Sequence, residues 1–425
     1  MRAGLRDFAG LSSSYYWLWV GNILSSFGDA AVLIMLSWFL VDTVTMKGAL
    51  GIALMTMGIC RVVLMLVGGI ASDRYNRRTI MFLSLIARGA VLFLFSLVIL
   101  VCDPSWYPAA AFVMAGLFGA VDAFFWPASG AIVPSLVAKD QLGAANSLLS
   151  ISQQISIVGG PLIASVLLGH VSFPVMFAVN ASMFALGSLF IFAIRIKPVS
   201  PGRRDEAPKP AGFIRELMDG AKYMISIRIL FLLSLLSLLI NFMLNGPLNV
   251  GLPVLIKQLN WDGSMFANME GVLGAGAVAG GIIVGLSKGF RGRLHLLAWF
   301  VVVMGGSLTA LGFMQQAYHG FVVMAILGMM LTMIDVPFNT YAQTVVETHM
   351  LGRFISLNRL MGLGLSPLSY FLASFLLDHQ IATPAIVLAI GGASVAFMGI
   401  CLYFTRDFRR IEQHPAWRQK EVSVS

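Results

Sequence analysis

The chain has 425 residues, of which 58% are apolar and only 11% are charged. Charged residues make up about a quarter of an ordinary soluble domain, so this composition excludes that class. The net charge of +9 does not imply a nucleic-acid partner, because membrane proteins collect positive residues in their cytoplasmic loops.

Long apolar runs, separated by Gly, Pro or charged residues, recur along the whole chain. They last about 20 residues or more, the length that an α-helix needs to cross a bilayer, whereas barrel strands are shorter and alternate. The pattern therefore predicts an all-α polytopic membrane protein with twelve transmembrane helices. Their predicted limits are 16–40, 49–71, 80–101, 108–133, 145–168, 173–194, 229–255, 266–287, 294–314, 321–345, 357–377 and 385–404.

Lys and Arg are unevenly divided between the two sides of these spans. With the N-terminus inside, the cytoplasmic segments hold 24 of them and the external loops hold two, Lys47 and Lys257. Since positive residues favour the cytoplasmic side, both termini are predicted to be cytoplasmic.

The longest polar stretch separates the spans into two groups of six. Within it, Gly212–Ile225 is expected to form an amphipathic surface helix. The predicted organisation is a cytoplasmic N-terminus (1–15), an N-terminal six-helix bundle (16–194), a cytoplasmic linker with that helix (195–228), a C-terminal six-helix bundle (229–404) and a cytoplasmic tail (405–425).

The two halves repeat certain residues at corresponding positions. Asp122 with Pro127 in the fourth span is echoed by Asp335 with Pro337 in the tenth. Parallel repeats of this kind place a substrate site between the halves, near the bilayer midplane. We therefore expect two pseudo-symmetric bundles.

Charged residues inside the spans need a reason, because each costs at least about 2.5 kcal/mol at the bilayer centre. Asp29 lies near the middle of the first span and Arg61 near the middle of the second, while Arg88 lies in the third. Asp29 is predicted to be a proton-linked or substrate-facing carboxylate. The alternative is a structural ion pair with Arg61, and the two roles need not exclude each other.

A second acid, Asp122, has Trp126 one helical turn away. An acid beside an aromatic ring suits a cationic amphiphile, and the alternative is a hydrogen bond within the N-terminal bundle. Asp335 with Asn339 occupies the pseudo-equivalent place in the tenth span, with the same two interpretations.

The seventh span carries Asn241, Asn245 and Asn249 on one helical face. Pro247 and Pro253 are expected to interrupt this helix. Three Asn on one face either line the substrate site between the halves or form hydrogen bonds to a neighbouring helix. The prolines are expected to act as a hinge at the external end.

A dense group of charges occupies the short break between the second and third spans. This break resembles the signature loop of the major facilitator superfamily, Gly-x-x-x-Asp-Arg/Lys-x-Gly-Arg/Lys-Arg/Lys. It departs only at Asn76, where the pattern has Gly, and Asn accepts a left-handed turn more readily than other non-Gly residues. The matching residues are Gly69, Asp73, Arg74, Arg77 and Arg78.

The loop is interpreted as part of the cytoplasmic gate. Asp73 is expected to accept from the N-terminal end of the eleventh span, near Arg353, where the helix dipole favours an acid. Gly69 would permit that approach, and the loop arginines would tether it to acids or lipid headgroups. The alternative is topology alone, with three positive charges that keep the loop inside.

Three further stretches are similar to bacterial macrolide-efflux-like proteins, a group that includes siderophore exporters. They are Pro134–Asn146, Phe213–Glu216 and Leu351–Leu357. The resemblance implies export of an amphipathic small molecule, usually coupled to proton entry, across a bacterial inner membrane. Only the Gly159-Gly160-Pro161 core of the family's antiporter pattern is present, which supports transport more firmly than antiport. The alternatives are a siderophore or lysolipid-like substrate, or transport without proton antiport.

Other classes lack their sequence signals. The chain has no Gly-x-x-x-x-Gly-Lys-Ser/Thr loop, no catalytic cluster and no metal-ligand spacing. We therefore predict a monomeric secondary transporter, not an enzyme, surrounded by lipid, with a small-molecule substrate and protons as coupling ion and without cofactor or metal. The substrate's charge stays open, since the embedded acids favour cations, whereas Arg61 and Arg88 favour anions.

Overall fold

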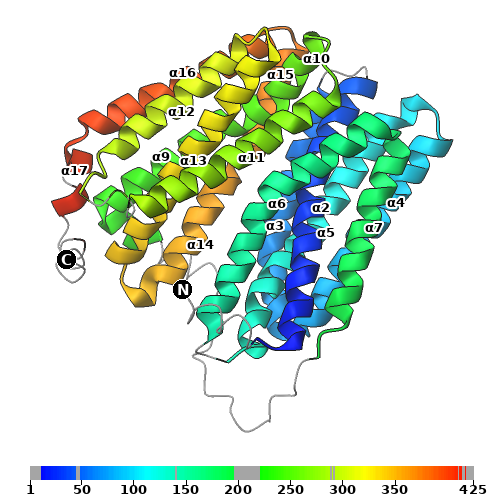
Figure 1. The fold of residues 1–425 in the computed structure, drawn as a ribbon, viewed down its shortest axis with the longest axis horizontal. Helices are drawn as coiled ribbons and strands as arrows, with labels where there is room; N and C mark the ends of the chain where they lie inside the picture. The colour runs from blue at the N-terminus through cyan, green and yellow to red at the C-terminus, as the bar shows by residue number, and fades with distance from the viewer. Residues whose placement is uncertain are drawn as a thin grey trace. The chain divides into compact units, whose positions relative to one another are not determined.

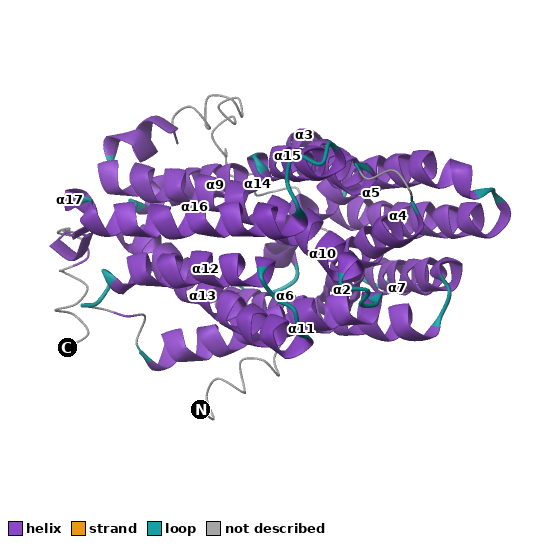
Figure 2. Ribbon diagram, turned by 90° about the horizontal axis from the view of Figure 1, so that it is seen from above, coloured by secondary structure: helices purple, strands orange, loops and turns teal. Residues whose placement is uncertain are grey.

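The computed structural model describes residues 11–44, 48–138, 141–195, 221–287, 290, 292–409, 411–413 and 417. Nearly all of this part of the chain is helical, and no strand occurs in it (Figure 2). The predicted all-α class is confirmed. Most of the predicted linker, including the first part of Gly212–Ile225, lies outside the described residues.

Ten helices within the described ranges are long and apolar enough to cross a bilayer. Two further apolar stretches, Ala49–Met65 within a longer helix and the helix Leu296–Gly312, lie where the second and ninth spans were predicted. The protein is therefore a multi-pass membrane protein. The number of crossings and the side on which the termini lie stay predictions.

The chain divides into two compact units, which we call unit 1 and unit 2. Unit 1 consists of Met1–Val199, Pro253–Gly271 and Leu377–His379, and unit 2 of Ser200–Leu252, Val272–Leu376 and Gln380–Ser425. Three of the described helices, α10 (Leu252–Gln258), α11 (Gly263–Leu286) and α15 (Ser366–Asp378), contribute residues to both.

Unit 1 is built from six long helices that are blue to green in Figure 1. Helix α3 packs on α5, α4 packs on both α5 and α7, and α2 packs on α6 and α7. These pairings bring α2, α3, α4 and α5 close enough to share side-chain contacts. The helices are α2 (Ser13–Thr43), α3 (Ala49–Arg74), α4 (Arg77–Val101), α5 (Tyr107–Ile132), α6 (Leu142–His170) and α7 (Phe173–Phe192).

Unit 2 repeats part of this packing with its own helices. Helix α12 packs on α13 and α16, and α9 packs on α14 and α16. The helices are α9 (Arg228–Gly246), α12 (Leu296–Gly312), α13 (Ala317–Val345), α14 (Thr348–Gly364), α15 (Ser366–Asp378), α16 (Pro384–Phe404) and α17 (Arg406–Arg409).

Two predicted spans are not continuous α-helices. The seventh contains a π-helical turn, Pro247–Gly251, between α9 and α10. The eleventh, predicted as one span over 357–377, is instead two helices, α14 and α15, separated at Leu365. Prolines at 247 and 367 explain both breaks, because proline has no N–H to donate to the preceding turn.

Glycines set the closest helix crossings in each unit. A Cβ on Gly119 of α5 would collide with the carbonyl oxygen of Met57 in α3. In unit 2, a Cβ on Gly280 of α11 would lie 2.5 Å from the carbonyl oxygen of Met329 in α13. Small residues let membrane helices approach backbone to backbone, and corresponding helix pairs use this device in both units.

Candidate functional site

Three charged side chains meet inside unit 1 around Arg88 of α4. Its Nη1 lies 2.7 and 3.0 Å from the two carboxylate oxygens of Asp29 in α2, and 2.8 Å from Oδ1 of Asp122 in α5. Its Nη2 donates to the hydroxyl of Ser25 at 3.0 Å. One guanidinium therefore bridges carboxylates from two helices.

A fourth charge completes the group. Arg61 of α3 pairs with Oδ2 of Asp122 through its Nη2 and Nε. Two guanidinium groups and two carboxylates carry no net charge when all four are ionised. We call Asp29, Arg61, Arg88 and Asp122 the charge network.

The network has a dry centre and more accessible ends. The side chains of Arg88 and Asp122 are 0% exposed, compared with 14% for Asp29 and 38% for Arg61. Removing an ion from water costs several kcal/mol, so ionised groups persist in such an interior when they are paired. Asp29 and Arg61 are therefore the two members of the network that keep some exposed surface.

Aromatic rings enclose the guanidinium of Arg88. Its Cζ lies 4.7 Å from the ring centre of Phe125, 4.9 Å from that of Phe184 and 6.0 Å from that of Phe118. Ring faces attract a guanidinium and exclude water from it. The Nε of Arg88 has no hydrogen-bond partner in the described part of the chain. The guanidinium is therefore held by the two carboxylates, the Ser25 hydroxyl and the aromatic rings.

The position of Asp29 depends on how closely α2 approaches α7. Gly28 permits this approach, because a Cβ there would lie 2.7 Å from Cζ of Phe184. The amide of Asn180 in α7 donates to the carbonyl oxygen of Gly28 at 3.2 Å. One turn of α2 separates Ser25 from Asp29, so both side chains reach Arg88.

The structure thus brings together Asp29, Arg61 and Asp122, all predicted as site residues, and adds Arg88. The ion pair on Asp29 is formed with Arg88, whereas the sequence suggested Arg61 as its partner. From the sequence, Arg88 was predicted only as an embedded charge that favours anions, with no partner assigned to it. The missed signal was the matching number of embedded acids and arginines in the first four spans.

The predicted acid–aromatic pair has a different geometry from the one expected. Trp126 is half-buried, and its ring packs edge to face on Phe125 with 5.6 Å between centroids. The carboxylate of Asp122 is already bound by two arginines. A cationic ligand would therefore have to displace an arginine to reach it.

The signature loop is fastened within unit 1 by its last two arginines. Arg77 donates from Nη1 to the carbonyl oxygen of Ala131 at 2.7 Å, and Arg78 donates to the carbonyl oxygen of Phe192. The Cζ of Arg78 also lies 4.8 Å from the Phe192 ring. These carbonyls belong to the last turns of α5 and α7, where helical hydrogen bonds run out. Here the arginine partners are helix ends, where we had expected acids or lipid headgroups.

Two other expectations about the loop are modified. Asn76 has an ordinary φ of −65° and caps α4 by accepting from the N–H of Arg78, so the expected left-handed conformation is wrong. A Cβ on Gly69 would meet no atom within 4 Å, and Arg74 is exposed. The side chains of Asp73 and Arg353 lie outside the described part of the chain.

In unit 2, the three aligned asparagines divide between two roles. Asn245 donates to the hydroxyl of Ser366 in α15 at 3.0 Å, which is a bond to a neighbouring helix. Asn241 and Asn249 donate to backbone carbonyls of their own helix, at 2.8 and 3.0 Å.

A serine hydroxyl enters the backbone ladder just before the π-helical turn. The Oγ of Ser369 accepts from the N–H of Gly246 at 2.7 Å and donates to the carbonyl oxygen of Phe242. Those two backbone groups would bond to each other in a regular helix, and insertion between them is a recognised cause of distortion. Together with Pro247, this contact explains why the seventh span is irregular.

Asp335 does not repeat the environment of Asp122. Asp335 is exposed on its unit, and the amide of half-buried Asn339 donates to its backbone carbonyl at 2.9 Å. The helices that correspond to α3 and α4, namely α11 and α12, contain no arginine. The sequence repeat therefore does not extend to the charge network.

Among the described residues, no three His, Cys, Asp or Glu side chains gather as a metal site. The site offers paired charges, hydroxyls and aromatic rings. Such groups can bind and release ions or polar solutes through changes in pairing.

Comparison with known proteins places this arrangement in a family. The family model of the Major Facilitator Superfamily matches residues 18–368. Macrolide efflux protein A of Streptococcus pyogenes is 26% identical over 379 residues, which cover 86% of this chain and 89% of that protein. A Na(+), Li(+), K(+)/H(+) antiporter of Planococcus maritimus is 28% identical over 148 residues, or 34% of each protein.

A solved structure supports the same conclusion at the level of the fold. The crystal structure of nucleoside transporter NupG has a TM-score of 0.71 with this chain at 12% identity, covering 94% of this chain and 99% of that one. The family match over most of the chain, the apolar helices and this shared fold agree. The chain belongs to the Major Facilitator Superfamily and is a membrane transporter rather than an enzyme.

Proposed function

We propose that the protein exports amphipathic small molecules across a bacterial inner membrane by alternating access, in exchange for protons. The similarity to macrolide efflux protein A, which extends over most of both chains, supports the substrate class. The similarity to a cation/proton antiporter covers only a third of each chain and supports the exchange more narrowly.

The coupling proposal depends on one observation: Arg88 is shared between two carboxylates that differ in exposure and in their number of arginine partners. Asp122 is fully buried and held by both arginines, whereas Asp29 is partly exposed and pairs with Arg88. If Asp29 takes up a proton, Arg88 keeps its pair with Asp122. The buried guanidinium therefore keeps a partner, and the cost of about 3–5 kcal/mol for leaving it unpaired is avoided. Protonation at Asp122 would weaken two pairs at once.

Proton uptake at Asp29 has an electrostatic and a mechanical consequence. The charge network changes from neutral to +1, which disfavours a bound cation nearby. The ionic tie between α2 and α4 is lost at the same time, since Asp29 lies on α2 and Arg88 on α4. A proton on Asp29 and a cationic substrate near the network therefore disfavour each other, the minimum requirement for exchange.

The remaining predicted residues keep their proposed roles, each within its own unit. Trp126, Asn241, Asn245, Asp335 and Asn339 are candidates for substrate contact. The loop residues Gly69, Asp73, Arg74, Arg77 and Arg78, together with Arg353, are candidates for gating.

The test is transport of radiolabelled erythromycin, a macrolide, by purified protein in proteoliposomes under an imposed pH gradient. Asp29→Asn should abolish the response to the gradient while the protein stays folded by circular dichroism. Asp103→Asn is the matched control, because Asp103 is exposed and its side chain does not cap the following helical turn. A gradient response in Asp29→Asn equal to wild type would exclude Asp29 as the coupling residue.

The substrate class is tested separately with the same wild-type preparation. Ligand-induced thermal stabilisation against macrolides, cationic dyes, siderophores and lysolipids should be largest for the macrolides and dyes. Stabilisation only by siderophores or lysolipids would instead support the alternative substrate class.

A further inference from the structure

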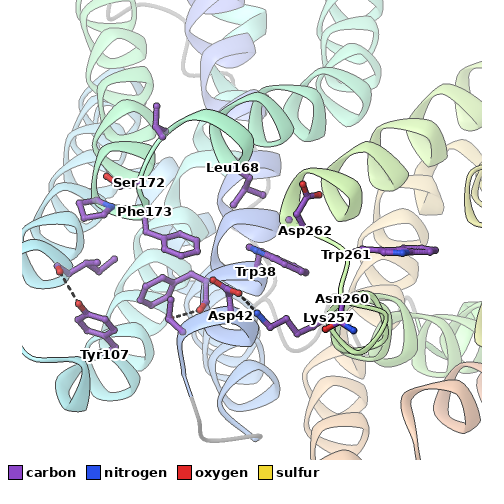
Figure 3. A pocket seen from close by; sticks show the side chains of 16 residues that line it. Trp38, Asp42, Tyr107, Leu168, Ser172, Phe173, Lys257, Asn260, Trp261 and Asp262 are labelled. Carbon is purple, nitrogen blue, oxygen red and sulfur yellow. Dashed lines mark hydrogen bonds and ion pairs between the residues drawn. The ribbon is translucent and has the colours of Figure 1, made fainter. Parts of the chain in front are cut away.

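Unit 1 contains a cavity of about 720 Å³ where α2 and α6 end and α5, α7 and α11 begin (Figure 3). It lies far from the charge network, because Asp42 follows Asp29 by 13 residues, or about 20 Å along α2. Small-molecule sites in proteins have volumes of about 300–1,000 Å³, so a drug-sized ligand fits this cavity.

The aromatic side chains in the wall of the cavity are closely packed. Phe39 is 0% exposed and has its ring 5.1 to 5.9 Å from four others, including Tyr107 and Phe173, which also line the cavity. Trp38 stacks on Phe266 at 6.4 Å and is only 5% exposed. Because these rings are closely packed, they lose little side-chain freedom when a ligand binds.

The ammonium group of Lys257 already lies beside an acid and an aromatic ring of the cavity lining. The Nζ of Lys257 pairs with the carboxylate of Asp42 and lies 6.0 Å from the ring centre of Trp38 (Figure 3). A carboxylate next to a tryptophan face is a favourable site for an organic cation. The side chain of Lys257 is 45% exposed, so a ligand ammonium can replace it and leave the lysine in solvent.

The cavity's other carboxylate adds negative charge. Asp262 is exposed and accepts from the hydroxyl of Ser264 and the N–H of Met265 at the start of α11, at 2.8 and 2.9 Å. The lining therefore has two carboxylates, those of Asp42 and Asp262, and one ammonium group. When Lys257 moves out, the balance favours a cation further.

We propose that this cavity is a second binding site, which takes an amphipathic organic cation whose charged centre displaces Lys257 from Asp42 and Trp38. The aromatic wall receives the apolar part of the ligand. The inference concerns binding, and it depends neither on the direction of transport nor on proton coupling.

The test uses purified full-length protein and two probes of the same shape, the cation tetraphenylphosphonium and the anion tetraphenylborate. Val171 lines the cavity and is 36% exposed, so Val171→Cys reports occupancy once the native Cys60, Cys102 and Cys401 are replaced by Ser. The rate of alkylation by N-ethylmaleimide should fall with tetraphenylphosphonium and be unchanged with tetraphenylborate. A protein that retains only the exposed Cys102, which does not line the cavity, should show no protection.

Two substitutions shift the protection in opposite directions. Asp42→Asn should raise the half-protecting concentration of tetraphenylphosphonium by roughly tenfold, whereas Lys257→Gln should lower it, because the competing ammonium is removed. Asp103→Asn changes charge outside the cavity and should have no effect.

Absence of protection, equal protection by both probes, or protection of Cys102 to the same degree would each overturn the proposal. So would a loss of protection in Lys257→Gln, a result that stays informative even if Asp42→Asn does not fold.

Discussion

Replacement of Arg88 by methionine tests whether the charge network stabilises unit 1. Methionine keeps an unbranched chain like the aliphatic part of arginine but lacks the guanidinium, which removes the hydrogen bonds to Asp29, Asp122 and Ser25. Removing one partner of a buried ion pair costs about 3–5 kcal/mol, because the other charge is left uncompensated. We expect the free energy of unfolding of Arg88→Met to fall by that amount.

A second substitution predicts which carboxylate is left uncompensated. Asp122 keeps its pair with Arg61 when Arg88 is removed, so Asp29 is the carboxylate that is left without a partner. Adding Asp29→Asn should therefore recover most of the lost free energy, since the two charges that remain, Arg61 and Asp122, are paired with each other. Adding Asp122→Asn should not, because it leaves Asp29 without Arg88 and takes from Arg61 its pair with Asp122.

The assay is titration with sodium dodecyl sulfate from mixed micelles, followed by the helical circular dichroism signal. Arg228→Met is the matched control, since Arg228 also pairs with an acid, Asp407, at 2.8 Å, but is 86% exposed. An exposed pair contributes at most about 1 kcal/mol. The reasoning is refuted if Arg88→Met loses no more than Arg228→Met, or if Asp29→Asn fails to rescue it.

Three further predictions concern packing. Gly68→Ala should cost about 1–3 kcal/mol, because its methyl would lie 2.6 Å from a backbone carbonyl oxygen of α5, whereas Gly69→Ala should stay within about 0.5 kcal/mol. Equal losses in detergent thermal denaturation would contradict this. Ser369→Ala leaves the buried N–H of Gly246 without its acceptor and should cost about 1–3 kcal/mol, with faster hydrogen exchange at that amide; unchanged exchange would exclude the bridging role. Phe408→Ala, at a fully buried site in the core of unit 2, should cost about 3–5 kcal/mol and speed proteolysis of the tail; an unchanged cleavage rate would show that Phe408 does not anchor it.

The helical spans were predictable because their signal is local. Twenty successive apolar residues are enough to define a crossing helix, whatever its neighbours are. Breaks inside a span are less visible, because a proline can be tolerated or can split the helix. Pro127 lies within the continuous helix α5, whereas Pro247 begins a π-helical turn that a serine from α15 also stabilises.

The candidate site was only partly predictable. The embedded acids Asp29 and Asp122 drew attention because a charge in a membrane needs a partner. The identity of that partner was not available, because it depends on the rotation of α2, α3, α4 and α5 about their own axes. Arg88 could equally have faced another helix, and only the packing places it between the two carboxylates.

The sequence by itself determined that this protein is a multi-spanning helical membrane protein, since hydropathy and loop charge act residue by residue along the chain. It also indicated the transporter family, through a loop motif whose residues are adjacent in sequence. The tertiary structure decided which charges neutralise each other, how the loop arginines cap neighbouring helices, and where Lys257 meets Asp42 and Trp38. These contacts join residues far apart in the chain, and their geometry follows from how the helices pack.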